Sequence, residues 1–187
     1  SFVGDPKYAD DGTVDVLLSG EVSGSALDAA TRTLAFGHLT TQLRFTVQGD
    51  ALFGTTTTVK SVTLKGTGLP TGLDLRTNAL VYDASTGVKV PGIDGTQAIT
   101  EQVAQAGESV MVPPYGAKTF KIDVATVTAA GKEIVYRDVT VTVSDATTLP
   151  GKAYTIALTF AGYEITAQAS VAEWDYTGTG SGDVTTD

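Results

Sequence analysis

The stretch that decides the fold is PGKAYTIALTFAGYEITAQASV, residues 150–171. Apolar and polar side chains alternate over 152–160 and again from Ile165 to Val171. A period of two is typical of a strand that buries one face. The intervening Ala161-Gly162 leaves room for only a tight turn, so the stretch predicts a β-hairpin. The preceding Pro-Gly pair suits the centre of a type II turn, because Pro presets φ and Gly accepts a positive φ.

The same alternation recurs towards the N-terminus, over 43–47 and 120–125. A second hairpin is predicted from strands at 120–127 and 133–143, joined by a turn at 129–132. In its second strand one face is expected to carry Val135, Arg137, Val139, Val141 and Val143, opposite Tyr136, Asp138, Thr140 and Thr142. Strands that bury one face and expose the other to solvent are typical of antiparallel sheets. The sequence therefore predicts an all-β fold, an antiparallel β-sandwich.

Some segments depart from this pattern. Val59 is out of step with Val62 and Leu64, which predicts either a bulge or the start of a strand at Val62. Trp174 is out of step with the last strand, which predicts a bulge or a change of face before it. The segments 26–31 and 96–107 each fit either a short helix or a loop.

Turn-forming residues crowd together over 83–95, which favours a linker there. The predicted organisation is an N-terminal domain over 1–90 and a C-terminal domain over 91–187, ending in a flexible tail at 177–187. The alternative is a long loop within one sandwich.

Composition excludes several classes of protein. The 187 residues carry a formal net charge of −9, and 42% of them are hydrophobic. That apolar content argues against disorder, and the acidic balance argues against nucleic-acid binding. No apolar run approaches the length of a membrane span. Cysteine is absent, so disulfides, thiolate metal sites and cysteine nucleophiles are excluded.

Motifs for chemistry are scarce. His38 is the one histidine, too few for a zinc site, and no nucleophile elbow accompanies it. A structural role for His38 is therefore expected. The glycine-rich segment 66–72 lacks the spacing of a phosphate-binding loop and is interpreted as an ordinary loop.

Acidic and aromatic residues leave two alternatives open. Asp5, Asp10, Asp11 and Asp15 cluster without calcium-loop spacing, which favours a solvated acidic segment over a weak calcium site. No pair of carboxylates is marked out for glycoside hydrolysis. A carbohydrate-stacking surface stays open through Tyr8, Tyr82, Tyr115, Tyr154 and Tyr163. We expect no catalytic, cofactor-binding or metal-binding residues, no cofactor, and no enzymatic activity.

Three segments carry a family resemblance. The first is LAFGHLTTQLRFTV (34–47), the second is VMVPP (110–114) before FKIDV (120–124), and the third is LPGKAYTIAL (149–158) with a last strand that ends VAEW (171–174). Together they resemble the fimbrillin family of Bacteroidales bacteria, the FimA/Mfa-like pilins and fimbrillin-like lipoproteins. The resemblance covers roughly residues 15 to 176.

The resemblance implies two transthyretin-like β-sandwich domains and export as a lipoprotein to the outer membrane of a Gram-negative bacterium. It also implies a non-catalytic, cell-surface fimbrial subunit that assembles by β-strand addition. In such proteins an N-terminal strand is removed by proteolysis, and a neighbour's strand fills the exposed groove. The implied partners are other fimbrial subunits, with host proteins or glycans as further candidates. The alternative is a surface adhesin or a glycan-binding or host-protein-binding module that does not polymerise.

Two features differ from the family pattern. No cysteine is present for lipidation, so a lipid anchor is expected upstream of Ser1 or not at all. The N-terminal domain is also expected to be short, with leading strands removed or a reduced first domain. Residues 171–187 are a candidate donor strand or docking strand, with a frayed tail as the alternative.

Overall fold

A computed structural model describes residues 11–25, 33–51, 53, 56–84, 87–162, 164–172 and 174. Within this part of the chain every regular element is a β-strand, which confirms the all-β prediction. The described residues hold no helix with the length and hydrophobicity needed to cross a membrane. The strands are β1 (Leu17–Ser19), β2 (Phe36–His38), β3 (Thr41–Gly49), β4 (Thr58–Leu64), β5 (Leu69–Asp74), β6 (Ala79–Asp83), β7 (Val88–Lys89), β8 (Ala104–Gln105), β9 (Val110–Val112), β10 (Thr119–Val127), β11 (Glu133–Val143), β12 (Ala153–Ala161) and β13 (Glu164–Ala172).

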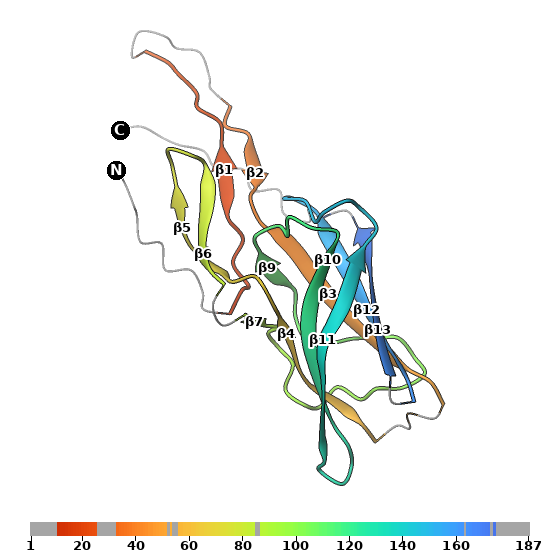
Figure 1. Cartoon of the computed structure of the whole chain (residues 1–187). Helices are drawn as coiled ribbons and strands as arrows, with labels where there is room; N and C mark the ends of the chain where they lie inside the picture. Colours follow the sequence, from red (N-terminus) through yellow and green to blue (C-terminus); the bar gives the residue numbers. More distant parts are fainter. Residues whose placement is uncertain are drawn as a thin grey trace.

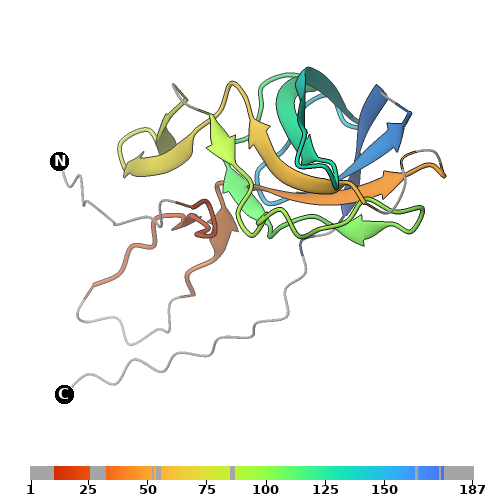
Figure 2. The same cartoon turned by 90° about the horizontal axis from the view of Figure 1, so that it is seen from below.

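Nine strands form one strongly curled sheet, a half-barrel, in the order β7-β4-β10-β11-β13-β12-β3-β8, with β9 also paired to β3 (Figures 1 and 2). The expectation of an antiparallel sandwich needs correction, because the sheet is mixed. β12 runs parallel to β3, and β11 runs parallel to β13. Both parallel pairs join strands that are distant in the sequence, and alternation within a strand does not fix the direction of such a neighbour.

Both predicted hairpins are confirmed. β10 pairs antiparallel with β11, and β12 with β13. Of the two alternatives for the segment at Val59 and Val62, the bulge is confirmed, because β4 already begins at Thr58. Val59 and Ser61 pair with consecutive residues of β10, which leaves Lys60 as the extra residue.

The core fills the inside of the curled sheet. Leu43, Phe45 and Val47 of β3 are almost completely buried there. Tyr154 of β12 is also buried, and its hydroxyl donates to Asp145 Oδ2 and accepts from the backbone N–H of Leu149, each at 3.1 Å. A buried phenol needs such partners, since an unpaired polar group in a core is costly.

The two ends of the large sheet meet in one segment, residues 88–112, which we call the seam. The seam first runs along β4, where Val90 N–H donates to Val62 O at 2.9 Å. It then crosses over and runs along β3 through β8 and β9. Over 96–107 the chain forms a loop and a short strand, so the loop alternative for that segment is confirmed.

Two small sheets, β1-β2 and β5-β6, stand beside the half-barrel on one side (Figure 2). β5 begins inside the glycine-rich segment that was expected to be a loop. The close approach to β6 explains one of its glycines, because a Cβ on Gly68 would lie 1.4 Å from Asp83 O.

The division into domains at residue 90 stays a prediction. Strands from both sides of that residue pair within the large sheet, as β4 does with β10 and β3 with β12. The segment 26–31 and the tail at 177–187 lie outside the described residues.

Candidate interaction groove

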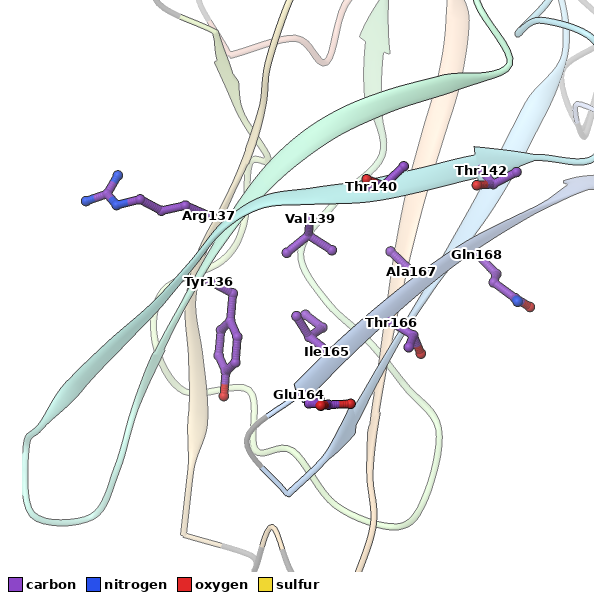
Figure 3. A pocket seen from close by; sticks show the side chains of 10 residues that line it. All are labelled: Tyr136, Arg137, Val139, Thr140, Thr142, Glu164, Ile165, Thr166, Ala167 and Gln168. Atoms are coloured by element: carbon purple, nitrogen blue, oxygen red, sulfur yellow. The ribbon is translucent and has the colours of Figure 1, made fainter.

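The large sheet parts between β11 and β13. These neighbours pair only over three positions, Val141–Val143 with Ala167–Ala169. On the other side of Val141 the strands diverge and leave a groove of about 810 Å³ (Figure 3). Its lining residues are Tyr136, Arg137, Val139, Thr140, Thr142, Glu164, Ile165, Thr166, Ala167 and Gln168.

The groove has an apolar floor and a polar rim. Tyr136, Val139 and Ile165 lie between the two strands (Figure 3) and pack against the core. The ring of Tyr136 meets Phe160 edge-on, with centroids 5.8 Å apart at 73°. Arg137 points away from the floor into solvent (Figure 3). Such a combination suits a partner that is apolar on one face and polar on the other.

The groove also exposes sheet edges. In the registers of the described strands, residues 133–136 and 139–140 of β11 pair with β10 alone, and residues 164–166 of β13 pair with β12 alone. The backbone on the side of each strand that faces the groove therefore resembles that of an edge strand, which is a template for another strand.

A bulge in β11 explains why the strands part. Register shifts between Ile122 and Val124 of β10, so that Asp123 lies opposite both Arg137 and Asp138. Asp138 has a φ of 56°, the left-handed region that Asp tolerates better than most residues. A bulge bends its strand, and this one lies next to the point where β11 leaves β13.

Charged side chains hold the bulge. The N–H of Asp138 donates to Asp123 Oδ1 at 2.8 Å. Lys65 Nζ lies 2.7 Å from Asp138 Oδ1 and 3.6 Å from Asp123 Oδ1. The hydrogen bond from Lys65 lowers the pKa of the Asp138 carboxyl below its ordinary value.

The bulge corrects one sequence prediction. Val135 was expected on the same buried face as Val139, but it is exposed, while Tyr136 turns inwards. The extra residue shifts the alternation by one position, so residues before and after it point to opposite faces. The charged Arg137 on an otherwise valine face was the signal of this shift in the sequence.

His38 lies in a separate structural cluster. Its Nδ1 lies against the Asp15 carboxylate, and the Thr40 hydroxyl donates to the other oxygen of that carboxylate. Its ring stacks on Trp174, with centroids 4.3 Å apart at 25°. The cluster ties the chain before β1 to β2 and to Trp174, two residues beyond the end of β13. The geometry thus favours the structural role expected of His38.

The other predicted site residues do not converge. Asp11 accepts hydrogen bonds from the N–H and hydroxyl of Thr13, which lower the pKa of its carboxyl, whereas Asp15 bonds His38. Asp5 and Asp10 lie outside the described residues. In the described part of the chain no group of three or more His, Cys, Asp or Glu is placed to hold a metal ion.

The tyrosines considered for carbohydrate stacking are dispersed. Tyr154 is in the core, and Tyr115 stacks on Phe120 with centroids 4.2 Å apart. Burial raises the pKa of the Tyr115 phenol, and its hydroxyl donates to Lys65 O at 3.1 Å. Tyr82 of β6 is exposed. Tyr8 and Tyr163 lie outside the described residues.

The fimbrillin-like family matches residues 5–174, nearly the whole chain. The chain therefore belongs to the fimbrillin-like family, as its sequence motifs indicated. No curated protein matches the sequence significantly.

Several solved structures are similar at low identity. A candidate cell adhesion protein of Parabacteroides distasonis has a TM-score of 0.50 at 8% identity, over 79% of this chain and 55% of that one. A fimbrial protein of Bacteroides vulgatus has a TM-score of 0.44 at 15% identity, over 76% of this chain and 56% of that one. The tip fimbrial protein Mfa3 of Porphyromonas gingivalis was solved with a C-terminal truncation. It has a TM-score of 0.42 at 10% identity, over 74% of this chain and 52% of that one. The chain spans about half the length of these structures, and at such identities the likeness concerns the fold alone.

Proposed function

We propose that this fimbrillin-like protein is a non-catalytic structural protein of the cell surface, a pilin-like fimbrial subunit that joins its neighbour by β-strand addition. Family membership supports the fimbrial role. The observation that carries the assembly mechanism is the groove between β11 and β13, where two neighbouring strands of a sheet part and leave an apolar floor uncovered.

A strand is the occupant that fits this groove. Its backbone would pair with the unpaired sides of β11 and β13, and alternate side chains would cover Val139 and Ile165. The side chains between them would face solvent beside Thr140 and Thr166 on the rim. Main-chain pairing gives affinity, and the apolar floor gives specificity. A contact of this kind uses different surfaces on the two copies, so it builds a filament when the rotation between copies does not close a ring.

The proposed location is the outer surface of a Gram-negative cell, with a lipid anchor supplied from outside the 187 residues. Transthyretin-like domains, with boundaries at 1–90 and 91–187, are part of the same proposal. It rests on the family and on the resemblance of the sequence motifs.

A second candidate is an adhesin that does not polymerise, with glycans or host proteins as partners. The exposed aromatic rings of Phe36 on β2 and Tyr82 on β6 favour it, since exposed rings are the usual contacts to sugar faces and protein partners. The two rings lie on separate small sheets (Figure 2). Glycan-array binding that both Phe36→Ala and Tyr82→Ala abolish, in a protein that stays monomeric, would select this candidate.

Assembly of concentrated protein tests the fimbrial proposal, with the N-terminal residues both intact and trimmed by protease. The wild-type chain is expected to form SDS-resistant ladders or fibres. Ile165→Glu places a charge on the groove floor and should leave monomers. The matched control Leu75→Glu makes the same change at an exposed turn far from the groove and should assemble normally.

Far-UV circular dichroism of both variants separates loss of assembly from loss of fold. Strict monomers of the wild-type chain under every trimming condition, or ladders from a folded Ile165→Glu variant, would contradict the proposal.

A further inference from the structure

The outer face of the large sheet divides into a charged half and an uncharged half. On β4, β10 and β11 many outward side chains are charged and form ion pairs, as Lys60 does with Glu133 and Arg137 with Asp123. On β3, β12 and β13 the side chains that alternate with the buried ones are mostly uncharged. Two rows of three cross-strand neighbours form the centre of this half, which we call the uncharged face: Thr46, Ala157 and Gln168, then Gln48, Thr159 and Thr166.

Two opposite charges stand at opposite corners of the uncharged face. Arg44 lies one alternate position beyond it on β3, and Glu164 lies one alternate position beyond it in the other direction on β13. Arg44 Nε donates to Gln42 Oε1 at 2.8 Å. In the described part of the chain, neither Arg44 nor Glu164 takes part in an ion pair. Both charges are therefore available to a partner that carries the opposite charges in the same arrangement.

The pattern fits a second copy of the same chain. A formal net charge of −9 makes two copies repel each other, and the repulsion is smallest where each presents uncharged groups. Thr hydroxyls and Gln amides both donate and accept hydrogen bonds, so the face is complementary to itself. It carries no aromatic ring, which disfavours a sugar as the occupant.

We propose that two copies of this chain associate side by side through the uncharged face, about a two-fold axis. An axis in the plane of the contact, passing between Ala157 and Thr159, places Arg44 of each copy against Glu164 of the other. Two equivalent ion pairs then flank the hydrogen-bonding centre. A two-fold contact uses the same surface on both copies, so it closes as a dimer and does not itself build a filament.

The contact is small, and its strength in a fimbria would come from repetition. Strand spacing and residue rise give a contact of roughly 15 Å across the strands and 25 Å along them. That is below the size of a standard protein interface, so a weak dimer is expected for the free chain. Along a row of subunits the same contact recurs and the gains combine. The inference goes beyond the proposed function, because it adds a lateral contact that is independent of strand addition.

Exchange of the two corner charges tests the contact, because it should abolish the dimer and then restore it. Arg44→Glu or Glu164→Arg alone brings like charges together at both corners and should weaken dimerisation at least about ten-fold. An equimolar mixture of the two variants restores opposite charges at both corners and should dimerise about as tightly as the wild type. Sedimentation equilibrium of the monomer-sized fraction, at concentrations up to about 1 mM, measures the three cases.

Lys60→Glu is the matched control, because it makes the same change of charge on the charged half of the face. It should leave the dimer unchanged, and circular dichroism checks that every variant is folded. The inference would be overturned by a wild-type chain that stays monomeric, by a mixture that dimerises no better than either variant alone, or by a loss with Lys60→Glu as large as with Arg44→Glu.

A parallel assay for SDS-resistant ladders separates this inference from the proposed function. Glu164 also lines the groove, whereas Arg44 lies two strands away from it, so the assay uses Arg44→Glu. Ladders should persist in this variant while the lateral dimer is lost. Wild-type ladders without a lateral dimer would overturn this inference and leave the proposed function standing. A lateral dimer without ladders would do the reverse.

Discussion

The curled sheet is interrupted at the seam and at the groove, and the two interruptions differ in whether backbone hydrogen bonds close them. At the seam, backbone hydrogen bonds close the interruption, including one from Glu108 N–H to Pro91 O at 2.8 Å. Ile99 is completely buried beneath it. At the groove, β11 bends away at its bulge, and Ile165 is only partly buried. The difference indicates that the seam serves stability, and it supports the proposal that the groove receives a partner.

The largest expected effect comes from truncating the buried side chain at the seam. Ile99→Ala should lower the free energy of unfolding by about 2–5 kcal/mol, because it removes a fully buried side chain and leaves a cavity. Ile165→Ala at the groove should cost clearly less, since that side chain already meets solvent. Urea unfolding of both variants measures the difference. Equal losses would remove the distinction between seam and groove.

The seam also depends on a glycine. Gly107 has a φ of 71°, and a Cβ there would lie 2.5 Å from Pro91 O and 2.6 Å from Ile93 Cγ1. Gly107→Ala should therefore destabilise the protein by about 1–3 kcal/mol, from backbone strain and close contact together. Gly131 is the control, because it also has a positive φ but nothing lies within 4 Å of its Cβ position. Thermal melts in which Gly131→Ala lowers the melting temperature as much as Gly107→Ala does would contradict the packing argument.

The smallest expected effect concerns the pH dependence of the bulge at the groove. The pKa of Asp138 is lowered in the folded protein, so its contribution to stability is present above its unfolded pKa and is lost as the pH falls through the folded value. Asp138→Asn keeps a residue that tolerates a positive φ but removes the charge. The difference in unfolding free energy between wild type and variant should shrink as the pH falls below about 4. A difference that stays constant down to pH 2 would argue against the Lys65 contact as its source.

Sequence reasoning predicted the local parts of the fold well. Alternation and turn residues define both hairpins because a tight turn forces its two strands to pair. The parallel pairs were not predictable in this way, since β3 and β12 are joined by no turn and their contact depends on the whole curled sheet.

The groove was missed for a related reason. It depends on a parallel pair, β11 with β13, and on a bulge that changes which face Tyr136 occupies. The sequence carried one sign of the bulge, a charged Arg137 in line with valines, but not its consequence for a distant strand. The absence of a catalytic or metal-binding site stays a prediction.

Hydrogen exchange before and after assembly tests most directly the claim that the groove receives a strand. In the monomer, those backbone amides of 164–166 and of the facing part of β11 that point into the groove are expected to exchange fast, while the amides that bond β12 or β10 and those of the seam exchange slowly. In assembled protein the groove amides should become protected, with the seam unchanged. Groove amides that are already protected in the monomer, or that gain no protection on assembly, would contradict the account.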